Sequence, residues 1–325
     1  MTSELTDERR RGVWNRNRGR NVRTDMNKRI IPVLLVAALG FAACGSDSES
    51  PAADDSLPPV ADDSVPPAPD DSQPPVVDGF EHPTGEEDIV VEYAEVGGFL
   101  PREFAFQQTP NVLVSGYGRV FGPGAQIAIY PGPLLPAVQV QPITEAGIQA
   151  ILAAADEAGL FQDIDYEQPT NIADASTARV TINVNGETYV HEAYALGLAL
   201  PEEAGRETTP ERQALAAFIA ELNDLTTLVG AGELGEQTLF EASEYGIEAL
   251  VVDDLSIYGS DGIEPTVEEW PADVTVRLAD ASTCTVVSAD EVDETLAAAN
   301  QLTFFEDAGV TYQVLARPVL PGSTC

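Results

Sequence analysis

Three consecutive eight-residue repeats, ADDSLPPV, ADDSVPPA and PDDSQPPV, limit where this 325-residue chain can fold. They occupy positions 53–76, where paired prolines favour polyproline II and adjacent aspartates repel one another. Such a segment cannot bury enough apolar surface to offset the entropy lost on folding. We therefore predict a disordered Asp/Ser/Pro-rich tether over 44–87, reaching on the order of 100 Å. The folded part is expected to begin near Asp88 and to span 88–325.

A short apolar run, Ile30–Ala43, precedes the tether and ends at a single cysteine, Cys44. A transmembrane helix needs about 20 apolar residues, so this run is too short to span, but it has the length of a signal-peptide core. Lys28 and Arg29 precede it as a basic n-region. The letters FAAC at 41–44 resemble the lipobox of bacterial lipoproteins, with Phe41 at a position that is usually aliphatic.

The lipobox resemblance implies that the Cys44 thiol carries a diacylglyceryl group and that the chain is cut before it. The lipid would then attach the protein to a membrane outside the cytoplasm, at the cell surface or in the periplasm. Residues 1–43 would be a cytoplasmic n-region extension and a signal peptide, with Met26 as an alternative start. An ordinary secretory signal with an incidental cysteine stays open. The rest of the chain resembles uncharacterised secreted lipoproteins of high-GC Gram-positive bacteria, and that resemblance supplies no activity.

The charge of the exported part excludes one class of partner. Of 54 acidic and 16 basic residues, four acidic and nine basic ones precede Cys44, which leaves a formal charge of −43 after it. Such a surface repels phosphate backbones and anionic headgroups. We therefore expect no nucleic-acid partner, and membrane attachment only through lipid on Cys44.

The folded part is predicted to be α+β, with antiparallel sheets and about three helices. The first helix begins after Thr144 and stops at Gly159, and the second begins at Thr209-Pro210 and extends past Leu225. A capping box of Ser288 and Glu291 opens the third. Strands are expected at Asn111–Ser115, Gln126–Tyr130, Asp273–Leu278, Thr283–Val287 and Thr311–Arg317, together with a hairpin at Arg179–Glu192 that turns at Asn185-Gly186.

An internal similarity allows two tandem strand-helix units. Without gaps, Val140–Asp163 aligns with Cys284–Asp307 and shares LAAA and a later Phe-x-Asp. Two subdomains would then divide near 235–245. Two similar units that arose independently are the alternative.

Two segments resemble known binding motifs, but the residues and elements around them do not fit those motifs. GAGELG at 230–235 fits a dinucleotide fingerprint, but a helix precedes it where a strand is required, so we interpret it as a loop. A calcium loop with Gly262 and Glu268 would need ligands at Ile257 and Gly259. We predict no cofactor and no metal site.

Histidine and arginine positions favour structural roles. His82 falls in the predicted tether, and His191 lies opposite Val180 on the apolar face of the hairpin, as a partnered core histidine. Arg277 and Arg317 are expected to be buried with a carboxylate.

The cysteines give one more prediction. If lipid occupies Cys44, only Cys284 and Cys325 remain, and two exported cysteines pair by default. A free terminal thiol or an intermolecular bond is the alternative.

No catalytic residue can be named from these patterns. The sequence favours a lipid-anchored, non-catalytic binding or structural module for an unknown extracellular protein or ligand. The alternative is an extracellular hydrolase with a carboxylate pair, which would require a deep pocket lined by convergent carboxylates.

Overall fold

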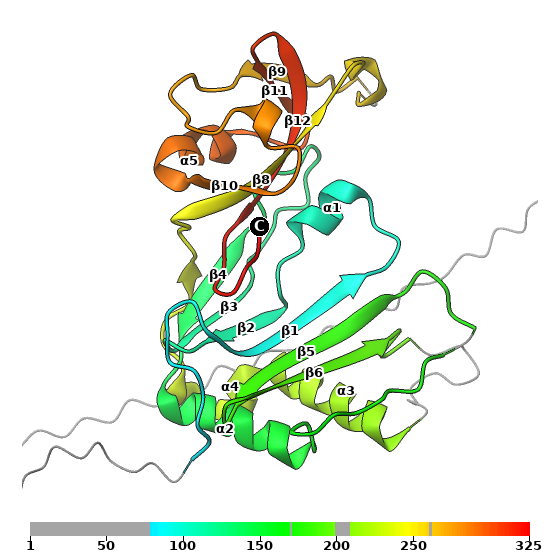
Figure 1. Ribbon diagram of the computed structural model, residues 1–325, viewed down its shortest axis with the longest axis vertical. Coiled ribbons are helices and arrows are strands. Elements are labelled where there is room, and N and C mark those ends of the chain that lie inside the picture. Colours follow the sequence, from blue (N-terminus) through cyan, green and yellow to red (C-terminus); the bar gives the residue numbers. More distant parts are fainter. Residues whose placement is uncertain (1–78, 170, 199–208, 260–261) are drawn as a thin grey trace, which may run out of the picture. The chain divides into compact units, whose positions relative to one another are not determined.

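The computed structural model describes residues 79–169, 171–198, 209–259 and 262–325 (Figure 1). The predicted signal peptide, Cys44 and the repeats lie outside the described residues. As predicted, the fold is α+β with antiparallel sheets. None of the helices in the described part has the length and hydropathy of a transmembrane span.

The first sheet has seven antiparallel strands in the order β6-β5-β1-β2-β3-β4-β7. They are β1 (Ile89–Gly97), β2 (Val112–Ser115), β3 (Arg119–Pro123), β4 (Val138–Pro142), β5 (Ser176–Val184), β6 (Glu187–Tyr194) and β7 (Thr238–Leu239). The β5–β6 hairpin turns at Asn185 and Gly186, both at positive φ, and pairs Val180 with His191 as the sequence predicts.

The second sheet has five strands in the order β10-β8-β12-β11-β9. They are β8 (Glu244–Val251), β9 (Thr266–Glu269), β10 (Thr285–Ser288), β11 (Thr303–Asp307) and β12 (Val310–Pro318). Its pairs are antiparallel except β9 with β11, which is parallel. The chain passes from the first sheet to the second between Leu239 and Glu244.

Three helices cover one face of the first sheet and build its core (Figure 1). In α2 (Glu145–Glu157), the apolar residues Ile148, Ile151 and Leu152 recur at helical spacing and are buried. Thr144 caps this helix by accepting a hydrogen bond from the Gly147 N–H.

The predicted second helix is two helices. α3 (Pro210–Leu222) begins at the expected Thr209 cap, but it ends before Asn223, and Leu225 belongs to α4 (Leu225–Val229). The break follows from Asp224, whose carboxylate caps a new N-terminus by accepting from the Thr227 N–H.

The third predicted helix is present without its capping box. α5 (Ala289–Ala298) covers the second sheet with Val292 and Leu296, but Ser288 makes no side-chain cap. The Glu291 carboxylate instead accepts from the Thr275 N–H at 2.8 Å and from its hydroxyl at 2.7 Å. A short α1 (Arg102–Gln107) was not predicted.

Two predicted strands are wrong. Asp273–Leu278 is a loop whose polar groups bond to side chains: the Val276 carbonyl accepts from the Trp270 indole, and the Leu278 N–H donates to Asp307. Gln126–Tyr130 is also outside any sheet.

The fold includes residues before Asp88, where the sequence predicts it to begin. Residues 79–87 were assigned to the tether, yet Phe80 exchanges two hydrogen bonds with the Gln149 side chain of α2, at 2.7 and 2.8 Å. Its ring packs edge-on against Phe161. His82, also assigned to the tether, bonds to Glu145 at 3.0 Å. These contacts tie the segment to α2, so the fold includes residues before Asp88.

The two similar segments share a strand followed by a helix, β4-α2 and β10-α5, but they continue differently. Phe161 lies outside any strand, whereas Phe305 lies in β11.

Candidate functional site

The loop between β3 and β4 is held at both ends. The Gly124 N–H donates to the Ala137 carbonyl at 2.8 Å, which closes the end nearest the first sheet. At the other end the Gly132 carbonyl accepts from the Gln301 N–H at 2.9 Å, and the Leu134 N–H donates to the Ala299 carbonyl at 3.1 Å. Leu134 is buried in the core of the second sheet. These fixed ends position the residues between them.

Those residues form an exposed apolar segment, Ala125–Tyr130. Ile127 is 65% exposed, Ile129 58% and Tyr130 55%. Their alternation is typical of a strand, but none of the strands in the described residues pairs with them, which explains why the predicted strand at Gln126–Tyr130 is absent. The one backbone hydrogen bond within the segment joins the Ile129 N–H to the Ile127 carbonyl, at 3.0 Å.

Beside this segment lies a hollow surface made of two adjoining parts, of about 680 and 280 Å³, which we call the α1 groove. Both parts are lined by Phe104 and Gln107 of α1 and by Gln301. The larger part reaches Ile127 and Ile129. The smaller part is lined by Tyr130 and Tyr258 and by Gln313, Val314 and Leu315 of β12.

The chemistry of the lining is apolar and neutral. Aliphatic and aromatic side chains alternate with the amides of Gln107, Gln126, Gln301 and Gln313, and Glu103 is the one carboxylate among the lining residues. No arginine lines either part. The groove can therefore bury apolar surface and offer neutral donors and acceptors.

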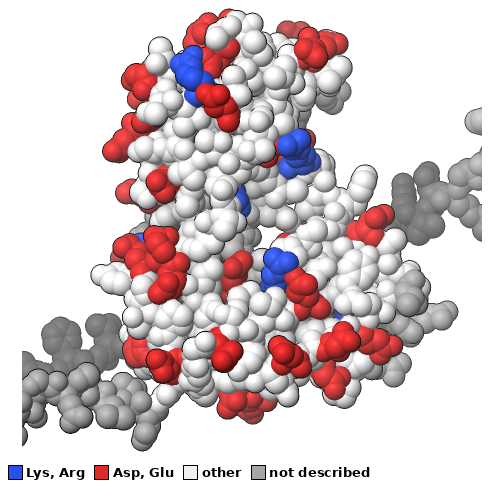
Figure 2. All heavy atoms as spheres, in the orientation of Figure 1, with Lys and Arg blue, Asp and Glu red and all other residues white. Residues whose placement is uncertain are grey.

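The neutrality of this region contrasts with the rest of the molecule. About one residue in six after Cys44 is acidic, yet 104–144 contains no Asp or Glu at all. This 41-residue stretch supplies much of the groove, and its lack of acidic residues is the feature of the sequence that marks the groove. Figure 2 shows carboxylates spread over the visible face, with few arginines among them.

The positive charges are already engaged. Each of the six described arginines has a partner: Arg102 with Glu248, Arg119 with Glu86, Arg179 with Glu192, Arg277 with Asp307, Arg212 with the carbonyls of Glu167 and Tyr194, and Arg317 with the Thr324 carbonyl. The described residues therefore offer no unoccupied cation to an anionic ligand.

The sequence predicts a carboxylate partner for Arg277 and for Arg317, and the described structure shows one for Arg277. Arg277 has the expected carboxylate partner in the buried Asp307, but its own side chain is 42% exposed, so the expected burial of the arginine is wrong. Arg317 does not have the expected carboxylate: its guanidinium donates to the Thr324 carbonyl at 3.1 Å and lies over the Phe106 ring, and burial lowers its pKa.

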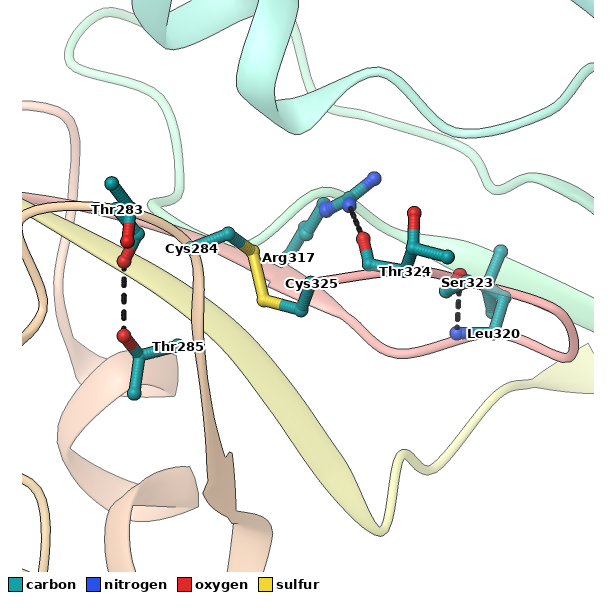
Figure 3. The surroundings of a disulfide bond; sticks show 8 residues. All are labelled: Thr283, Cys284, Thr285, Arg317, Leu320, Ser323, Thr324 and Cys325. Carbon is teal, nitrogen blue, oxygen red and sulfur yellow. Dashed lines mark hydrogen bonds between the residues drawn. A yellow bond between two sulfur atoms is a disulfide. The ribbon is translucent and has the colours of Figure 1, made fainter.

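Cys284 and Cys325 are joined by a disulfide, with their Cα atoms 5.0 Å apart (Figure 3). This is the pairing that the sequence predicts. It fixes the last residue of the chain beside β10 and β8, close to Arg317.

His191 is buried between two partners. One ring nitrogen lies 3.0 Å from the Tyr166 hydroxyl and the other 2.9 Å from the Leu160 carbonyl. Burial lowers its pKa, so the ring is neutral at pH 7. The sequence-based view of His191 as a partnered core histidine agrees with this geometry.

One described carboxyl group has a raised pKa. Burial raises the pKa of Glu92 on β1, and the nearby Arg179 partly offsets this. Glu92 is not among the residues that line the groove. No group of three or more His, Cys, Asp or Glu residues in the described ranges has the geometry to hold a metal ion.

The glycine-rich motif is a connection between α4 and β7. Gly230, at φ 89°, ends α4, and a single 3₁₀ turn follows at Ala231–Glu233. The strand-turn-helix context of a dinucleotide site is not present in this part of the fold.

No protein-family model, curated protein or solved structure matches this chain.

Proposed function

We propose that this protein is a lipid-anchored, extracytoplasmic binding module, held to a membrane through Cys44 and separated from it by the Pro-rich tether. The α1 groove is its binding surface, and it performs no catalysis. The observation that carries the proposal is an apolar, almost uncharged groove beside an exposed unpaired segment, in a molecule that is otherwise strongly acidic.

The disulfide supports the location. Disulfides persist where the surroundings are oxidising, as they are outside the bacterial cytoplasm. The bond between Cys284 and Cys325 leaves Cys44 as the remaining cysteine of the sequence, and its place directly after an apolar run supports a lipidation site.

The lining of the groove supports binding over hydrolysis. Acid-base cleavage of a glycosidic bond uses two carboxyl groups about 5–10 Å apart. The groove lining supplies one, Glu103, and its remaining polar groups are amides, hydroxyls and backbone atoms. Amides and hydroxyls at such positions can orient a ligand through hydrogen bonds.

The anchoring is tested by Cys44→Ser. We expect the variant to leave the membrane fraction, because a chain with a charge of −43 after residue 44 has no basic patch to hold it on anionic lipid. Metabolic labelling with an alkyne fatty acid should mark the wild type and not the variant. Retention of the unlabelled variant in salt-washed membranes would contradict the anchor.

The binding role is tested on living cells with a photo-cross-linking residue. Placed at Ile127, it should give a discrete adduct after irradiation, whereas at Val190, an exposed apolar position on β6 outside the groove, it should give none. Equal labelling at both positions, or none at Ile127, would contradict the groove as a binding surface.

A further inference from the structure

We infer that the α1 groove takes an extended apolar segment of a partner polypeptide that carries basic residues at its ends. This inference rests on the proposed binding function and adds the chemical class of the occupant. Three features carry it: unpaired main-chain groups beside the groove, a lining suited to peptide, and the charge of the surrounding molecule.

The unpaired main chain comes from Ala125–Tyr130. Within the described residues, no hydrogen bond reaches the N–H groups of Gln126, Ile127 or Ala128. Because both ends of the loop are fixed, these three N–H groups keep their positions although no acceptor in the described residues bonds to them. An extended peptide beside them would supply the missing acceptors and donors, as in strand addition.

The lining fits a peptide better than a sugar. Exposed branched aliphatic side chains such as Ile127, Ile129 and Ile257 can pack against the apolar side chains of a peptide, whereas a sugar has few apolar groups to bury against them. Phe104 and Tyr130 supply aromatic anchors of the kind that dominate binding energy at interfaces. The amide of Gln313 has no hydrogen bond within the described residues and is available to a guest backbone.

The negative charge of the molecule favours a partner peptide with basic residues at its ends. The described residues include 37 carboxylates and six arginines, all six with partners. A second copy of this chain would bring the same negative charge and be repelled, whereas a basic flank would be attracted. Glu103, at the groove itself, is the nearest carboxylate to receive that flank.

The test uses the full chain in detergent micelles and a phage library of random dodecapeptides. Selected peptides should alternate apolar residues, carry a net positive charge and bind more weakly as salt increases. Ile127→Asp with Ile129→Asp should reduce the affinity of the selected peptides by about tenfold or more. The matched control, Val190→Asp with Leu239→Asp, adds the same charge at exposed apolar sites outside the groove and should change it less than about twofold.

Three results would overturn the inference. Peptides that bind the groove variant as well as the wild type would place their site elsewhere. Self-association that the groove variant abolishes would identify a second copy as the occupant. Binding on a glycan array that the groove variant loses, without any enriched peptide, would overturn the peptide class and leave the proposed binding function intact. Failure of the Ile127 cross-link on cells, by contrast, bears on that function and not on the class of occupant.

Discussion

Gly246 on β8 lies directly beneath the disulfide, and this contact gives the sharpest stability prediction. β8 pairs with β10 on one side and with β12 on the other, opposite Val286 and Arg317 respectively. A Cβ added at Gly246 would stand 2.9 Å from the Cys325 sulfur and 3.2 Å from the Cys284 sulfur. Real Cβ atoms essentially never come so close to another heavy atom as the first of these distances, so Gly246→Ala must displace the bond or the strand.

The magnitude follows from two opposed effects. Overpacking of a well-filled site costs about 1–3 kcal/mol. Glycine within a strand is itself unfavourable, by roughly 0.5–1 kcal/mol relative to alanine. We therefore expect Gly246→Ala to give a net destabilisation of the oxidised protein of up to about 2.5 kcal/mol. In a Cys284→Ala, Cys325→Ala background the same substitution should be neutral or slightly stabilising, so that its sign changes.

Urea unfolding of the four proteins in this cycle measures the coupling. Trp270 is the one tryptophan after Cys44 and is 4% exposed in the core of the second sheet, so its fluorescence reports on this region. Removing the bond alone, which spans 41 residues, should cost about 4 kcal/mol by the loop-entropy estimate. If Gly246→Ala has the same effect in both backgrounds, within about 0.5 kcal/mol, the steric argument is wrong.

Two further perturbations follow from buried polar groups. Burial holds the pKa of His191 below its usual 6.5, so the unfolded chain binds an extra proton as the pH falls. The free energy of unfolding, measured in urea, should therefore decrease from pH 7.5 to 5.5. His191→Asn cannot titrate and should give a flatter pH profile. Arg102→Ala should lower the free energy of unfolding by about 1–2 kcal/mol, because it leaves the buried Glu248 carboxylate without its partner. Adding Glu248→Gln should recover part of that loss. If Arg102→Ala and the double variant are equally stable, Arg102 does not act through Glu248.

Local signals predicted the elements whose ends are set by a few neighbouring residues. Thr144 and Thr209 cap helices by bonding to the third residue along, and Asn185-Gly186 adopts the positive φ angles that a tight hairpin needs. Such features depend on sequence distances of two to four residues, so they can be identified without knowing the fold.

Long-range bonds explain the errors. Glu291 could cap its own helix, but Thr275 occupies its carboxylate. Gln126–Tyr130 has the alternation of a strand, and whether a strand forms depends on a neighbour that the local pattern cannot supply. β1, the strand that joins β5 to β2 in the first sheet, was missed because Glu92 and Glu95 interrupt its apolar residues.

Glu92 and Glu95 also help to explain why residues 104–144 contain no Asp or Glu. β1 contributes Val90 and Val91 to the core, yet it accommodates Glu92 and Glu95, so burial in this fold does not by itself exclude acidic residues. The segment at Ala125–Tyr130 is exposed, where a carboxylate would be solvated at little cost, and it nevertheless contains none. Folding therefore does not require this absence. A surface that a partner covers favours it, because each unpaired carboxylate there would have to be desolvated on binding.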